Sequence, residues 1–208
     1  DCWHERLNNE TNEISSGGGR DLLFVIIAAP IPGLIAKLPA ILHLNEEFFY
    51  SRNIGFIVFP MLTAFFAWKN QLSIGKTIFI AGATLAGIIF INTLPENKQS
   101  STLVLSSIHL PLFLWSLLGF AFVNDQKNNV EKRLGFLSYN CDLIVMTTLI
   151  VIAGAILTGV TIGLFSLIGM NIEKFYFENI VVFALPAAPI LATYLIRTNP
   201  QLVGKVSP

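Results

Sequence analysis

Long apolar runs separated by short polar stretches make up most of this chain. The longest run, residues 143–170, contains 28 consecutive residues without a charge. A helix needs about 20 apolar residues to cross the hydrocarbon core of a bilayer, whereas a helix of a soluble protein normally keeps a polar stripe. The pattern therefore predicts a membrane-spanning helix over this run.

Five further runs have the same character, so we predict an all-α fold, a polytopic transmembrane bundle of about six membrane-spanning helices. The predicted spans cover residues 22–44, 54–68, 77–94, 102–123, 143–170 and 180–196. The second span is short, but Trp68 and Lys69 at its end are typical of a helix that stops at the membrane interface. We expect residues 124–142 to form a loop whose apolar second half lies among the lipid headgroups.

Three prolines interrupt the first span, at Pro30, Pro32 and Pro39. Proline removes a backbone donor and clashes with the preceding turn, so this span should be kinked or broken near Pro30. Lys37 is the only charge inside an apolar run. A charge in the membrane favours an ion or substrate contact, but a lysine near a helix end can also extend its ammonium to water. Both interpretations stay open.

Polar residues gather in the fourth span, where Ser106, Ser107 and His109 precede Pro111. A serine and a histidine are a candidate nucleophile and base, but no GxSxG motif or third orienting acid is evident. Polar residues before a proline commonly bond the carbonyls that it frees. We therefore expect a structural role for His109, or a role in a proton relay or pore, and take Lys37 and His109 as the candidate polar intramembrane site.

Small residues recur at four-residue spacing in the fifth span, at Ala155, Gly159 and Gly163. This spacing places them on one helix face and lets two helix backbones approach closely. We predict that this helix-packing face meets another helix. The third span has similar pairs at Gly82, Ala83, Ala86 and Gly87.

Composition leads to the same class of protein. Hydrophobic residues make up 53% of the chain and charged residues 12%, against about 25% charged in soluble proteins. The 13 basic and 13 acidic residues balance, and no basic patch with interleaved aromatics argues for nucleic acid binding. Cys2 and Cys141 have no metal-binding spacing. We expect the lipid bilayer as partner, with no nucleic acid, metal or cofactor.

The two ends are unusual for a complete gene product, since the chain begins without methionine and stops directly after a span. We expect a fragment of a larger domain. Residues 1–20 would be a polar tail or loop with a Gly-rich linker, residues 21–198 a helical membrane domain, and residues 199–208 a truncated C-terminal segment. Further transmembrane helices of the same full-length protein, or a second copy, would then be partners.

A resemblance to a known family extends mainly over Leu103 to Pro208. Its features are the IHLPLFLW stretch at residues 108–115, Phe136 and Tyr139-Asn140 before a long uncharged helix, the Gly-Met-Asn-Ile exit at residues 169–172, and a proline-bearing last helix. In these the chain resembles a bacterial multi-pass membrane family of unknown function (DUF 4153). The resemblance implies an integral protein of the bacterial inner membrane, and it implies no agreed catalytic residues.

The distribution of charge predicts the orientation. If all six spans cross, nine basic residues lie on the side of the two termini and of the loops near residues 69–76 and 124–142, and three lie on the other side. Positive residues concentrate on the cytoplasmic side, so we expect both ends of this chain in the cytoplasm.

Three classes of function follow from these features. A non-catalytic membrane scaffold or regulatory component agrees best with the small-residue helix face. The alternative is a small-solute or ion transporter or channel component that uses the proline-broken first helix with Lys37 and His109. An intramembrane enzyme is the weakest choice, because the spans contain no HExxH motif and no paired carboxylates.

Overall fold

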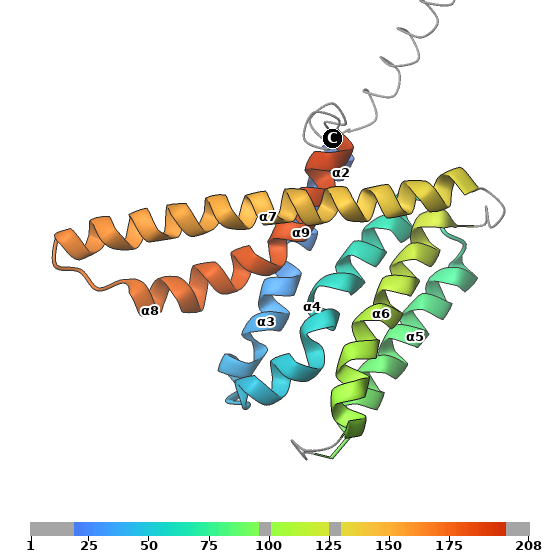
Figure 1. The fold of residues 1–208 in the computed structure, drawn as a ribbon, viewed down its shortest axis with the longest axis horizontal. Coiled ribbons are helices and arrows are strands. Elements are labelled where there is room, and N and C mark those ends of the chain that lie inside the picture. The colour runs from blue at the N-terminus through green and yellow to red at the C-terminus, as the bar shows by residue number, and fades with distance from the viewer. Residues whose placement is uncertain (1–18, 96–100, 125–129, 199–208) are drawn as a thin grey trace, which may run out of the picture. The chain divides into compact units, whose positions relative to one another are not determined.

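The computed structural model describes residues 19–95, 101–124 and 130–198. Within these ranges the chain is helical and has no β-strand, which confirms the predicted all-α fold (Figure 1). The predicted tail, up to residue 18, and the segment 199–208 lie outside the described residues.

Six stretches of the described residues are long and apolar enough to cross a membrane, as predicted. They are Asp21–Leu42, Glu46–Lys69, Ile74–Thr93, Ser101–Val123, Val130–Leu167 and Glu173–Thr198. The chain is therefore a multi-pass membrane protein by the length and composition of its helices.

The first of these stretches is broken, as its prolines predict. Helix α2 (Gly19–Ala28) ends just before helix α3 (Pro30–Leu42) begins. Proline has no N–H to bond the preceding turn but suits the first position of a new helix. The break at Ala29 therefore follows directly from Pro30.

The helices belong to two compact units. The first unit, residues 31–137, contains α3, α4 (Glu46–Lys69), α5 (Ile74–Thr93), α6 (Ser101–Val123) and the first two turns of α7 (Val130–Leu167). The second unit contains α2, the rest of α7, α8 (Glu173–Tyr176), the π-helical turn η1 (Phe177–Val181) and α9 (Val182–Thr198).

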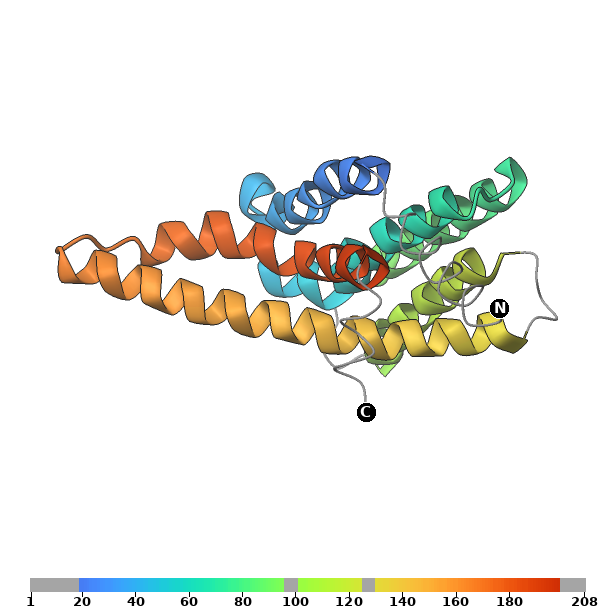
Figure 2. The ribbon, with the colours of Figure 1, turned by 90° about the horizontal axis from the view of Figure 1, so that it is seen from above.

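The core of the first unit lies where α4 packs against α5 and α6 (Figures 1 and 2). Two glycines permit this close approach. A Cβ on Gly55 would lie 3.1 Å from Leu114 Cδ1, and one on Gly87 would lie 3.2 Å from Phe56 Cζ. The buried cluster at this contact is Phe56, Ile91, Leu110, Leu114 and Leu117.

Helix α4 begins at Glu46 instead of at residue 54. The Asn45 side chain caps it by accepting a hydrogen bond from the Phe48 N–H at 3.0 Å. Glu46 and Glu47 occupy the first turn, where the helix dipole favours negative charge. Arg52, which the sequence interpretation left outside the span, therefore lies within a helix.

Helix α7 begins at Val130 instead of at residue 143, so the expected loop over residues 124–142 is wrong from Val130 onward. Its 38 residues extend over about 57 Å, well beyond a hydrocarbon core of about 30 Å. The early start has a tertiary cause. Phe136 packs against Trp115 and Phe122 of α6, with ring centroids 5.4 Å apart in both pairs.

The C-terminal end of α7 lies at Leu167, before the predicted end at residue 170. Gly169 adopts a positive φ of 79°, and its N–H donates to Ser166 O at 3.0 Å. A glycine in the left-handed region is a common helix stop. The chain then reverses, and α8, η1 and α9 run back in the opposite direction (Figure 2).

Candidate functional site

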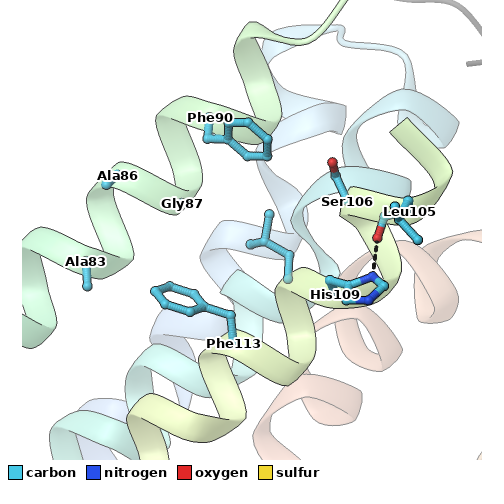
Figure 3. A pocket seen from close by; sticks show the side chains of 9 residues that line it. Ala83, Ala86, Gly87, Phe90, Leu105, Ser106, His109 and Phe113 are labelled. Atoms are coloured by element: carbon cyan, nitrogen blue, oxygen red, sulfur yellow. Dashed lines mark hydrogen bonds between the residues drawn. The ribbon is translucent and has the colours of Figure 1, made fainter. Parts of the chain in front are cut away.

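A pocket of about 480 Å³ lies between α5 and α6 in the first unit (Figure 3). Small side chains on α5 create the hollow, and the buried Leu110 of α6 forms part of its wall. The lining residues are Ala83, Ala86, Gly87 and Phe90 from α5, with Leu105, Ser106, His109, Leu110 and Phe113 from α6.

His109 and Ser106 are the hydrogen-bonding side chains of this pocket. His109 Nδ1 lies 2.8 Å from the carbonyl oxygen of Leu105, one turn earlier in the same helix (Figure 3). A carbonyl can only accept, so Nδ1 donates and the neutral ring has Nε2 as an acceptor. The imidazole is exposed, and Ser106 is half-buried.

Ser106 and His109, the candidate nucleophile and base, do not form a complete catalytic triad in this pocket. Ser106 and His109 are three residues apart on α6 and line the same pocket. The nine residues that line it include no aspartate or glutamate to orient the imidazole. The two side chains can therefore form hydrogen bonds to a ligand in an otherwise apolar pocket, but the lining residues supply no acid to complete a triad.

Lys37 is not one of the residues that line this pocket. It lies half-buried on α3, between the buried Ala36 and Pro39. The structure thus brings Ser106 and His109 to one cavity, and it leaves the second half of the candidate polar site elsewhere in the same unit.

A buried arginine of α4 was missed by the sequence interpretation. Arg52 is 3% exposed. Its Nη1 donates to Ile91 O at 2.8 Å and Leu94 O at 2.7 Å, and its Nη2 donates to Pro95 O at 3.3 Å. The guanidinium also lies 4.0 Å from the centroid of the Phe48 ring. These carbonyls lie at the C-terminal end of α5. The last carbonyls of a helix have no N–H partner within the helix, and that end carries negative partial charge.

A pair of amides lies beside this arginine. Asn53 Nδ2 donates to Asn92 Oδ1 at 3.1 Å, and Asn92 Nδ2 donates back to Asn53 Oδ1 at 2.9 Å. Together with Arg52, the pair joins α4 to the end of α5. The sequence signal was the Asn45-Glu46-Glu47 helix start, which would have placed Arg52 and Asn53 inside a span.

The predicted helix-packing face of α7 is exposed along its length. Ala155, Gly159 and Gly163 are all exposed, and no residue of α7 after Tyr139 is buried. A Cβ on Gly159 or Gly163 would meet nothing within 4 Å. No described element of the second unit covers this face, so its packing against another helix stays a prediction.

The second unit has a polar cluster of its own. Tyr139 of α7 is 5% exposed, and its hydroxyl lies 2.8 Å from Thr193 Oγ1 of α9. Arg197, one turn later on α9, interacts electrostatically with Asp21 of α2. These contacts tie α2, α7 and α9 together at one end of the unit.

The described residues include no group of three or more His, Cys, Asp or Glu side chains that could hold a metal ion. Cys141 is an exposed free thiol, and Cys2 lies outside the described residues. Comparison of the chain with models of protein families, with curated proteins and with solved structures found no match.

Proposed function

We propose that the chain is a non-catalytic membrane scaffold or regulatory component, and that α7 supplies its docking face. The observation that carries the proposal is the exposure of Ala155, Gly159 and Gly163 on a helix with no buried residue after Tyr139. Helices associate in lipid through close packing at small residues, because the lipid tails are as apolar as the side chains.

The position proposed for the chain is the bacterial inner membrane, with both ends of this chain in the cytoplasm. Its support is the asymmetry of basic residues, which remains nine to two when Arg52 is counted within α4, and the resemblance of residues 103–208 to the bacterial multi-pass family. The partner that we propose for α7 is a second copy of the chain.

The transporter alternative has less geometric support. It requires Lys37 and His109 to face one water-filled cavity. His109 lines an apolar pocket without Lys37, so the two residues do not share that pocket. A scaffold needs no such cavity, and for this reason we place it first.

Two glycines of α7 allow a matched test of the scaffold. Gly154 and Gly159 are both exposed, and a Cβ on either would meet nothing within 4 Å. A leucine at either position therefore fits within the chain itself. Five residues correspond to about 140° around a helix, so only Gly159 lies on the face with Ala155 and Gly163.

In vesicles that contain donor- and acceptor-labelled copies, we expect the wild-type chain to associate. Gly159→Leu should weaken association about tenfold, which corresponds to about 1.4 kcal/mol, and Gly154→Leu should leave it unchanged. Equal losses in both variants would contradict the packing face. A wild-type chain that stays monomeric at every protein-to-lipid ratio would contradict self-association.

A further inference from the structure

We propose that the pocket between α5 and α6 binds a glycerolipid, with one acyl chain along the pocket and the ester group beside Ser106 and His109. This site is independent of the α7 face. It combines an elongated apolar hollow with two hydrogen-bonding groups on one wall.

The pocket is long enough to take part of an acyl chain along the two helices. Its lining spans Ala83 to Phe90 on α5 and Leu105 to Phe113 on α6, so it extends about 10–12 Å along the helix axes.

The surface around the pocket is apolar and exposed, as a surface that faces lipid would be. Ile89 and Phe90 of α5 are 63% and 51% exposed, and Leu105 and Ile108 of α6 are 60% and 59% exposed. Both helices are apolar enough to cross a membrane. The pocket is therefore continuous with the protein–hydrocarbon interface, and its lining carries no lysine, arginine, aspartate or glutamate that would demand a charged occupant.

Ser106 lies toward one end of the pocket, and His109, at the middle of the α6 lining, bonds back toward that end through Leu105 O. Ser106 and His109, three residues apart, share a face of α6. The 23 residues of α6 extend over about 35 Å, only slightly more than a hydrocarbon core of about 30 Å. When α6 is centred and upright in the bilayer, Ser106, its sixth residue, lies about 5 Å inside the hydrocarbon boundary, within reach of the ester groups of a glycerolipid.

Each polar atom has a chemical counterpart in such a lipid. The Ser106 hydroxyl can donate to an ester carbonyl. The Nδ1 of His109 is engaged by Leu105 O, so its Nε2 is the ring atom that can accept from a glycerol hydroxyl or from a water at the ester. Deeper in the membrane, the wall continues as Ala83 and Phe113, which contact only hydrocarbon.

Photocrosslinking of the full chain tests the site. The chain is reconstituted in phosphatidylcholine vesicles that contain a small fraction of phosphatidylcholine with a diazirine in the middle of one acyl chain. After irradiation, we expect the crosslinked peptides to concentrate in residues 83–90 and 105–113.

Two alanines of α5 provide a matched pair of variants. Ala86 is exposed and lines the pocket, and Ala81 is exposed on the same helix outside it. Ala86→Leu should fill the hollow and lower crosslinking of these segments about fivefold or more, because the added methylene groups occupy the space of the acyl chain. Ala81→Leu should leave the yield unchanged, and equal thermal unfolding of both variants would show that each is folded.

Competition with unlabelled lipids tests the polar contacts. Ester-linked phosphatidylcholine should displace the probe better than its ether-linked analogue, and Ser106→Ala combined with His109→Leu should abolish that preference. An equal effect of both lipids on the wild-type chain would overturn the ester contact. Crosslinks spread evenly over α5, α6 and α7 would show surrounding lipid only, and a disulfide between copies of Ala86→Cys would show a helix in the pocket. Either result would overturn the site.

Discussion

At the scale of single residues, Arg52 shows how a charge is accommodated inside a span. Its guanidinium bonds three carbonyls at the end of α5 and lies on the Phe48 ring. An isolated charge would be expensive at this depth, but the negative end of a helix and an aromatic face both offset part of that cost. Arg52 therefore joins α4 to α5 as a positioning residue.

Replacing this arginine should destabilise the first unit. Arg52→Met keeps the apolar stem and removes every donor, so the free energy of unfolding should fall by about 2 kcal/mol, a value typical of hydrogen bonds from charged groups. Arg52→Lys should lose less, since the ammonium retains the charge without the planar fork. Stability can be measured by denaturant unfolding in micelles.

Lys174 supplies the control for this measurement. Its side chain is 87% exposed and pairs with Glu178 at 3.8 Å, so Lys174→Met should change stability by less than about 1 kcal/mol. If Arg52→Met and Lys174→Met behave alike, the capping role of Arg52 is wrong.

At the scale of helices, α7 extends beyond its apolar run because its first turns pack on α6. Phe136 occupies the space beside Gly119, where a Cβ would lie 3.0 Å from Phe136 Cε1. This contact explains why the headgroup loop expected before residue 143 is instead a continuous helix. The polar residues of that segment are compatible with a helix whose one face is docked.

This docking predicts opposite behaviour of two glycines. Gly119→Leu should push Phe136 away from α6 and lower the melting temperature, at a cost of about 1–3 kcal/mol for overpacking. A Cβ on Gly135 would meet nothing within 4 Å, so Gly135→Leu should be nearly neutral. Thermal unfolding in detergent compares the two, and a neutral Gly119→Leu would show that the α6–α7 contact is dispensable.

At the scale of the whole chain, six crossings would place successive connections between helices on alternate sides of the membrane. His43 follows the first span and Gln71 follows the second. Both residues are exposed, and both have a positive φ. If α4 crosses the membrane, these residues lie on opposite sides. The positive-inside rule predicts that Gln71 lies on the cytoplasmic side.

Cysteine labelling tests this orientation in a variant whose own Cys2 and Cys141 are replaced by alanine. A membrane-impermeant maleimide should label His43→Cys in intact cells, and it should label Gln71→Cys only after permeabilisation. Labelling of both positions from the same side would refute a crossing by α4, and the reversed pattern would refute cytoplasmic ends.

The six spans and the break at Pro30 could be predicted from sequence, because the hydrocarbon core of the membrane constrains each helix separately. Each crossing helix must satisfy its own backbone and be apolar over a known length, and proline interrupts that backbone wherever it occurs. His109 and Ser106 could be singled out for the same reason, as polar side chains within an apolar run.

Only the tertiary structure decided which of these residues meet. Ile91 lies 39 residues from Arg52, and the α5 half of the pocket is separated from His109 by a helix end and a connection. Such contacts depend on how the helices pack against one another, and the sequence of one apolar segment does not specify that packing. The same packing extended α7 back to Val130, placed His109 in a pocket without Lys37, and left Ala155, Gly159 and Gly163 uncovered.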